Sequence, residues 1–196
     1  MKRENVFHIF QKIPTIETER LTLRPMCVSD AQDMFEYARR ADVTKYLTWC
    51  PHPSLAYTKE YLSYVEGHYA AGDFFDWALV ERECGRMIGT CGFTRFHYEY
   101  DCAEIGYVIN PAFWGRGYAT EAVNAVIRFG FQRLELNRIE ARFIEGNAAS
   151  RRVMEKSGMT YEGMGRQNAY IKGEYRNVGT CSILRRDYFS YGADIF

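Results

Sequence analysis

The chain has 196 residues, and its 25 Lys and Arg residues balance its 25 Asp and Glu residues. Hydrophobic residues make up 47% of the chain and charged residues 26%, which is typical of a globular protein with one domain. A net charge of zero argues against non-specific binding to nucleic acids or to a membrane surface, because both need an excess of basic residues.

The N-terminal segments predict an arm followed by one strand. Residues 1–14 have no clear hydrophobic period, so we expect them to form an N-terminal arm. Residues 15–25 alternate between apolar and polar side chains, with Leu21 and Leu23 on one face. This alternation predicts a strand with one buried face, which Pro25 ends.

Two helices are expected next. Ser29 and Gln32 have the spacing of a capping box, which predicts a helix from there to about residue 39. A stripe of apolar residues predicts a second helix over residues 57–71, and Gly72 would stop it.

The central segments predict three strands and the longest helix. Two β-rich runs, 74–81 and 87–96, form a hairpin, and a third strand covers 102–109. A glycine-containing loop at 113–117 then leads into a helix with a strong apolar period.

The C-terminal segments predict a strand at 138–144, a short helix from Asn147 to Lys156, and a hairpin of strands 160–171 and 175–184. Three consecutive strands exclude a simple doubly wound sheet, so the fold class is α+β with a mixed sheet. We expect one domain over 15–189 and a tail over 190–196.

Cysteine and histidine spacing predicts no metal site. The six cysteines form no C-x-x-C pair, and the four histidines form no H-x-x-x-H pair. We expect reduced thiols, because a chain of this length does not need disulfides. We find no signal peptide and no apolar run near the roughly 18 residues that cross a membrane. These features predict a cytoplasmic protein without a membrane partner.

The turn between strand 102–109 and the long helix predicts an anion site. The first N–H groups of a helix have no partner within the helix, and the helix dipole is positive there. Gly115 and Gly117 let backbone amides approach a phosphate, and Arg116 adds a cation. The third glycine of the dinucleotide fingerprint is missing, and no G-K-[ST] follows, so neither a Rossmann site nor a Walker loop is expected. A plain glycine-rich connector stays open as the alternative.

The same region resembles a known family. Residues 103–111 and 114–122 resemble motif A of the GNAT acetyltransferases, and more narrowly the RimJ/RimL branch, which acetylates N-terminal amines of ribosomal proteins. The resemblance extends over about residues 15–189. It includes the segments 17–25, 137–141, 147–159 and 172–185.

The resemblance implies the GNAT fold, a splayed, mixed and mostly antiparallel sheet flanked by helices, with acetyl-CoA in the gap. It implies that the backbone of Tyr107, Val108 and Ile109 pairs with pantetheine, and that Asn147 and Ser150 approach the sulfur end. The pyrophosphate would be bound mainly by the amides of Gly115, Arg116, Gly117, Tyr118, Ala119 and Thr120.

Two positions depart from the family pattern. Trp114 stands where many members have Gln or Arg, and we expect cofactor binding to survive because backbone amides hold the pyrophosphate. Met154 stands where many members have a Tyr that protonates the leaving thiolate. Ser150 is the substitute donor in our interpretation. Its alternative role is that of a polar residue in the first turn of a helix.

The catalytic residues expected are Glu104, Tyr107 and Ser150. A backbone N–H near Tyr107 would stabilise the oxyanion. Glu104 would act as the base through a water molecule, or would only attract the amine as a surface carboxylate. An N-terminal amine with a pKa of about 8 makes little demand on a base, whereas deprotonating a lysine near 10.4 costs roughly 4 to 5 kcal/mol at neutral pH.

We therefore predict direct transfer of the acetyl group from acetyl-CoA to a primary amine in a ternary complex, with a protein or peptide N-terminal α-amine as acceptor. Acetylation of a polyamine, an amino acid or an antibiotic stays open, as does a non-catalytic acyl-CoA-binding protein. Trp49, Tyr98 and Tyr170 are candidates to line the acceptor cleft. The protein is expected to be a monomer or a homodimer joined through its C-terminal strands.

Overall fold

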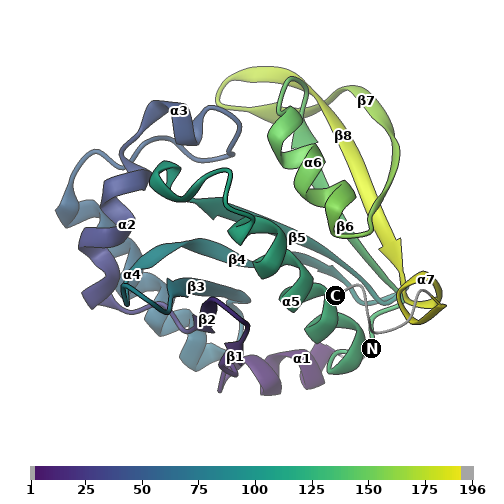
Figure 1. Cartoon of the computed structure of the whole chain (residues 1–196), viewed down its shortest axis with the longest axis horizontal. Coiled ribbons are helices and arrows are strands. Elements are labelled where there is room, and N and C mark those ends of the chain that lie inside the picture. The colour runs from purple at the N-terminus through teal and green to yellow at the C-terminus, as the bar shows by residue number, and fades with distance from the viewer. Residues whose placement is uncertain (1–2, 191–196) are drawn as a thin grey trace.

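The structure is a computed structural model that describes residues 3–190 (Figure 1). One sheet of eight strands, in the order β1-β2-β3-β4-β5-β6-β8-β7, forms its centre. The strands are β1 (Ile16–Glu17), β2 (Leu21–Arg24), β3 (Asp76–Glu81), β4 (Met87–His97), β5 (Cys102–Ile109), β6 (Arg138–Ile144), β7 (Thr160–Ile171) and β8 (Glu174–Leu184). Only β5 and β6 pair in parallel, so the expected α+β class with a mixed, mostly antiparallel sheet is confirmed.

Helices cover both faces of this sheet (Figure 1). They are α1 (Arg3–Phe10), η1 (Val28–Asp30), α2 (Ala31–Ala38), α3 (Ala41–Thr44), α4 (Leu55–Ala71), η2 (Pro111–Phe113), α5 (Tyr118–Gln132), α6 (Ala148–Lys156) and α7 (Arg185–Ser190). The apolar period predicted for α5 is confirmed, because Val123, Val126 and Ile127 are fully buried. The helices α1, α5 and α6 lie on one face, and α2 and α4 lie on the other. None of the described helices is long and apolar enough to cross a membrane.

The N-terminal segment differs from the expected arm. Residues 3–10 form helix α1, whose Val6 and Phe10 are fully buried. The Phe10 ring contacts Trp77 of β3 and Phe129 of α5, with ring centroids 5.4 and 6.0 Å apart. The arm prediction is wrong here because two buried positions in eight residues are too few to show a helical period. Of the expected tail 190–196, only Ser190 is described, and the rest lies outside the described residues.

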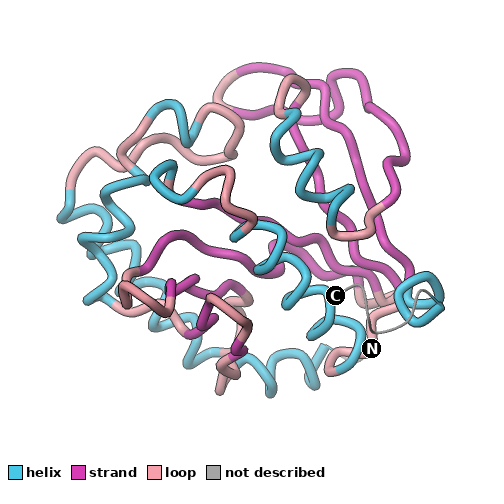
Figure 2. The backbone as a smooth tube through the Cα atoms, viewed as in Figure 1, coloured by secondary structure: helices cyan, strands magenta, loops and turns pink. Residues whose placement is uncertain are grey.

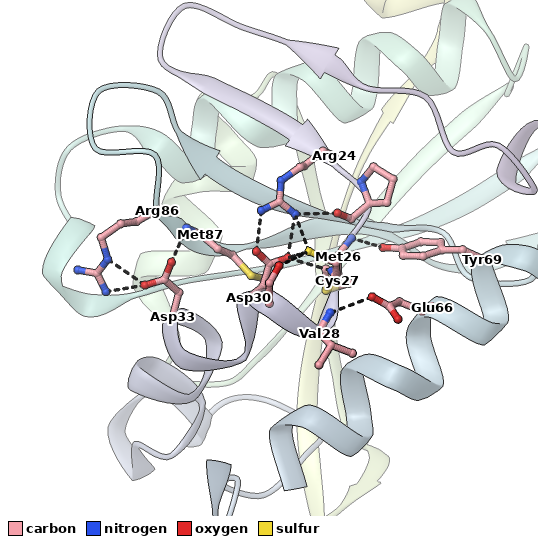
Figure 3. A network of polar contacts seen from close by, with 12 residues as sticks. Arg24, Met26, Cys27, Val28, Asp30, Asp33, Glu66, Tyr69, Arg86 and Met87 are labelled. Carbon is pink, nitrogen blue, oxygen red and sulfur yellow. Dashed lines mark hydrogen bonds and ion pairs between the residues drawn. The ribbon is translucent and has the colours of Figure 1, made fainter. Parts of the chain in front are cut away.

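The start of α2 also differs from the prediction. The capping box is formed by Cys27 and Asp30, not by Ser29 and Gln32: Oδ2 of Asp30 accepts the backbone N–H of Cys27 at 2.9 Å, and α2 follows with no side-chain cap of its own. Arg24 at the end of β2 holds both Asp30 oxygens at 2.6 and 2.8 Å, as Figure 3 shows. The same figure shows Asp33 bound to Arg86 and to the N–H of Met87. These long-range contacts override the local Ser29–Gln32 pattern and attach α2 to the sheet.

The remaining elements follow the expected order, with two additions. The segment 15–25 is not one strand but the β1–β2 hairpin, closed where Thr18 and Leu21 bond each other. Helix α4 ends at Gly72, which has φ 76°, as expected. The short helices α3 and α7 were not predicted, and each is too short to show a period.

The sheet divides at the centre. The parallel pairing of β5 with β6 covers only Cys102–Ile105 and Arg138–Ala141. Beyond it, β5 continues along β4 as far as Ile109, and β6 continues along β8 as far as Ile144. Figure 2 shows the two groups of strands spreading apart from this junction. The expected splayed sheet is thereby confirmed.

Candidate active site

The gap between β5 and β6 exposes backbone groups of β5. The N–H of Asn110 bonds Ile88 of β4 at 2.7 Å, and the carbonyl of Val108 faces Gly89 so closely that a Cβ there would lie 2.0 Å away. Successive residues of a strand direct their N–H and C=O groups to opposite neighbours. Tyr107 and Ile109 therefore direct theirs into the gap, whereas those of Val108 point to β4. The backbone groups of Tyr107 and Ile109 are thus oriented toward the gap, where the predicted pantetheine contacts would form, whereas those of Val108 are used within the sheet.

Trp114 forms a hydrogen bond with one of these backbone groups. Its indole Nε1 donates to the Ile109 carbonyl at 2.7 Å, while 53% of the residue is exposed. Trp114 thus folds back from the loop onto the end of β5, and Tyr107 keeps its backbone groups facing the gap. The residue that departs from the family pattern lies at the mouth of the gap.

The glycine loop directly follows β5 and η2. Gly115 and Gly117 have φ values of 74° and 84°, in the left-handed region that glycine adopts without strain. Gly117 caps α5 without any side-chain bond, and the first helical bond is from the N–H of Glu121 to Gly117 at 3.0 Å. The first-turn amides therefore keep their anion-binding capacity beside the gap.

An ion-paired cluster fixes this loop. Arg20 donates to the carbonyl of Arg116 at 2.9 Å, and its guanidinium lies 4.5 Å from the centre of the Tyr118 ring. Glu121 accepts from Arg20 at 2.6 to 2.8 Å and from Thr18 at 2.7 Å. Burial alone would raise the pKa of Glu121, but these bonds lower it below its usual value. We did not predict this role for Arg20, because the contact spans about half of the chain.

Tyr107 of β5 and Ser150 of α6 meet across the gap. The Tyr107 hydroxyl lies 2.9 Å from both the hydroxyl and the carbonyl oxygen of Ser150. Asn147 caps α6 by accepting the N–H of Ser150 at 3.2 Å. Burial raises the pKa of Tyr107, so its phenol stays protonated and can donate. Met154 is only 1% exposed and belongs to the core.

Glu104 is not part of this group. It lies in the paired part of β5, three residues before Tyr107, so its side chain is on the opposite face of the sheet. Burial raises its pKa, and the charges of Arg142 and Arg95 oppose that shift. Glu104 therefore has the electrostatic character of a base but faces away from the Tyr107–Ser150 pair.

The three aromatic residues predicted for the acceptor cleft have separate surroundings. Trp49 packs against His52, with ring centroids 5.4 Å apart, and Tyr170 is 66% exposed at the β7–β8 hairpin. Lys172 of that hairpin bonds the carbonyl of Thr44 in α3 at 2.6 Å, which brings the hairpin to the helices. Tyr98 follows β4 at the end where β5 and β6 are paired, so it is remote from the open gap.

A groove of about 770 Å³ begins at the glycine loop. Its lining includes Gly117 and Thr120 at the start of α5, and Asn124, Arg128 and Lys156 farther along. Within the described residues, the buried Oδ1 of Asn124 has no hydrogen-bond partner. Glu17, Glu19 and Glu121 line the groove as well, so Arg128 and Lys156 are the groups in it that could bind a phosphate, and the unpartnered amide oxygen could accept from a donor group.

Comparison with known proteins identifies the family. The chain matches the family described as "Acetyltransferase (GNAT) domain" over residues 20–160. It is 34% identical to "Uncharacterized N-acetyltransferase p20" of Bacillus licheniformis, over 89% of this chain and 98% of that protein. It is 31% identical to "Putative ribosomal N-acetyltransferase YdaF" of Bacillus subtilis, over 87% and 94% of the two chains.

Solved structures agree with the fold. A GNAT acetyltransferase from Bacillus anthracis superposes with a TM-score of 0.78 at 29% sequence identity. The match covers 88% of this chain and 99% of that one. The overall fold is thus one that this solved protein shares.

Proposed function

The chain belongs to the GNAT acetyltransferase family, and from this premise we propose that it acetylates N-terminal α-amines of proteins or peptides by direct transfer in a ternary complex. GNAT enzymes in general take the acetyl group from acetyl-CoA. The observation that carries the proposal is the meeting of Tyr107 and Ser150 across the open gap, directly beside the glycine loop.

The residues present fit acetyl-CoA. The positive φ values of Gly115 and Gly117 and the uncapped start of α5 form a cradle for its pyrophosphate. The backbone of Tyr107 is directed at the gap, where an extended amide-containing arm could pair with it. Arg128 and Lys156 in the adjoining groove could bind a further phosphate. When bound, acetyl-CoA supplies the acetyl group as a reactive thioester.

Groups of this chain would serve as the oxyanion donor, the general acid and the general base. The N–H of Tyr107 would donate to the carbonyl oxygen of the acetyl group as negative charge develops there. The hydroxyls of Tyr107 and Ser150 would protonate the departing sulfur, since Met154 is buried and has no proton to donate. Glu104 and other carboxylates on the opposite face are the candidates to receive the proton of the amine.

An N-terminal α-amine is the acceptor that the chemistry favours. Its pKa of about 8 leaves a large neutral fraction near neutral pH, so a moderate base suffices. A relative that is 31% identical carries a name that refers to ribosomal N-acetylation. We further propose a cytoplasmic location, where free thiols persist, and a monomer or homodimer.

Cofactor binding is tested by thermal unfolding with and without excess acetyl-CoA, with NADH as the control. Saturation at 100 times Kd stabilises a protein by about 2.7 kcal/mol. For a domain of this size the midpoint should rise by roughly 5 to 10 °C. A shift with acetyl-CoA alone supports the proposal, and no shift would show that the glycine loop is only a connector.

The acceptor is tested by following CoA release with paired peptides. Peptides that begin with Ser or Ala and contain an internal lysine should be acetylated when the N-terminus is free and not when it is blocked. Spermidine, free amino acids and an aminoglycoside form the small-amine arm. Release with the blocked peptide or only with small amines would overturn the α-amine proposal, and no release with any amine would favour a non-catalytic acyl-CoA-binding protein.

A further inference from the structure

Three residues form a straight row across the middle of the sheet. Asp76 of β3 stands opposite Gly92 of β4, which stands opposite Gly106 of β5. We call these three residues the Asp76 row. Gly106 is the first residue of β5 after its pairing with β6 ends at Ile105. The row therefore leads from a carboxylate directly to the edge of the gap.

The two glycines leave room that the carboxylate uses. Directly opposed residues direct their side chains to the same face of a sheet. Gly92 packs so closely against β3 that a Cβ there would lie 2.3 Å from the Cα of Asp76 and from the carbonyl oxygen of Phe75, and 2.8 Å from Oδ1 of Asp76, so only glycine fits beside the carboxylate. At Gly106 a Cβ would meet only the methyl group of Thr94, whose side chain is exposed. No side chain therefore stands on the sheet at Gly92 and Gly106, and we call this bare strip of backbone the Gly92–Gly106 floor. It is open to solvent at the end next to the gap.

Phenols from two helices enclose the other end. Tyr69 of α4 donates to the backbone carbonyl of Asp76 at 2.6 Å. Burial raises the pKa values of Tyr69, of Tyr61 in the same helix and of Tyr37 in α2, and the charge of Asp76 adds to each shift. Among the described residues, the Tyr37 hydroxyl is buried without a hydrogen-bond partner. A buried hydroxyl normally has a partner, so a water molecule beside Asp76 fits this enclosure.

The surroundings of Asp76 keep its proton affinity high. Its carboxylate accepts from the N–H of Trp77 at 3.0 Å, and a hydrogen bond from Thr90 also favours the charged form. Burial outweighs both and raises the pKa to about 7. The titratable groups whose pKa values the charge of Asp76 raises are Tyr37, Tyr61 and Tyr69, and Cys91 on the opposite face of β4; all four are neutral at that pH.

We propose that Asp76 receives the proton of the acceptor amine through water held over the Gly92–Gly106 floor. This inference rests on the proposed acetyltransferase function and assigns its base. Asp76 fits the task better than Glu104, because Glu104 stands in the closed, paired part of β5 and its charge is opposed by Arg142 and Arg95.

The transfer balances as follows. The carboxylate of Asp76 takes one proton from the ammonium group, which frees the nitrogen lone pair. The nitrogen bonds to the acetyl carbon, and the carbon–sulfur bond breaks with its electron pair remaining on sulfur. The second proton of the nitrogen reaches the sulfur through the Tyr107 and Ser150 hydroxyls, and Asp76 then releases its proton to solvent.

The test compares pH profiles of kcat for wild type, Asp76→Asn and Glu104→Gln, using the Ser- or Ala-terminated peptide with the higher wild-type rate. Wild-type kcat should rise with pH and level off above about 7. Asp76→Asn should lose about 100-fold or more near pH 7 and keep rising toward the amine pKa of about 8. Glu104→Gln tests the competing base, and its profile should keep the acidic limb whatever its rate. Asp73→Asn, an exposed aspartate three residues away that bonds His68, is the matched control.

A second variant and a direct titration do not depend on the folding of Asp76→Asn. Thr90→Val removes a hydrogen bond that favours the carboxylate, so the acidic limb of the kcat profile should move to higher pH. In the chain without acetyl-CoA, the NMR signal of the side-chain carboxyl carbon of Asp76 should titrate near pH 7. The signal is assigned by its absence from the spectrum of Asp76→Asn.

Three results would overturn the inference: an Asp76→Asn rate within about threefold of wild type, a titration midpoint near the ordinary value of about 4, or loss of the acidic limb in Glu104→Gln. Failure of the proposed function itself looks different. In that case wild type releases no CoA with any amine, and the assignment of a base falls with it.

Discussion

Asp76 should make the protein less stable as the pH rises, and Asp76→Asn should remove that dependence. The folded-state pKa of about 7 lies above the ordinary value of 3.8. The folded chain therefore binds more protons than the unfolded chain between these values. The contribution of protonated Asp76 to the free energy of unfolding is complete below about pH 4 and is lost as the pH rises through 7. Above that range, the folded protein must bury the charged form of this carboxylate, which lowers the free energy of unfolding.

The size of the effect follows from the same two pKa values. Between about pH 5 and pH 8.5 the wild type should lose about 2 to 3 kcal/mol through this one group, at 1.36 kcal/mol per pKa unit. Urea unfolding at both pH values, for wild type and for Asp76→Asn, gives four free energies of unfolding. Their double difference isolates Asp76, because the constant cost of burying the new amide and the contributions of other titrating groups cancel.

Asp42→Asn supplies the control, since its exposed carboxylate pairs with Arg40, which stays charged at both pH values, and it should give a double difference near zero. A value below about 0.5 kcal/mol for Asp76 would refute the reasoning. It would mean that water reaches the carboxylate freely and that the row of glycines encloses nothing. Increased stability of Asp76→Asn at high pH together with lost activity would instead mark Asp76 as a residue that favours function over stability.

The other predictions concern the gap, the loop and the first helix. Arg20→Ala should raise KM for acetyl-CoA about tenfold, with little change in kcat, because Arg20 holds the loop through Arg116; Arg40→Ala, which breaks an exposed ion pair, should change neither value. Tyr107→Phe and Ser150→Ala should each lower kcat about tenfold or more while the acetyl-CoA thermal shift persists, and their effects should not add, because the hydroxyls bond each other. Phe10→Ala should lower the free energy of unfolding by about 3 to 5 kcal/mol in urea titrations, and a loss below about 1 kcal/mol would show that α1 is dispensable for the core.

The sequence predicted an element correctly where the residues that specify it lie close together in the chain. The apolar stripe of α5, the alternation of β6 and the capping of α6 by Asn147 depend on residues close together in the chain, and all three predictions are confirmed. Helix α1 shows the limit of this approach. Its buried residues become meaningful only once Trp77 and Phe129 are placed against them.

Features that depend on strand register could not be predicted. Nothing near Asp76 in the chain distinguishes it from other aspartates, since its character comes from Gly92 opposite and from helix α4 above. The same holds for Arg20 and Glu121, which are 101 residues apart. The glycine loop was found because its chemistry is local, whereas the proton acceptor proposed here is made by the pairing of three strands.

The placement of Trp114 provides a built-in optical probe. Of the three tryptophans, Trp77 is fully buried, Trp49 is partly buried, and Trp114 is 53% exposed with its indole bonded to the end of β5. Quenching by iodide should therefore act mainly on Trp114, and a Trp114→Phe variant would identify its share of the emission. Ligand entry at the mouth of the gap can then be followed in real time by intrinsic fluorescence, without any label and before an acceptor is known.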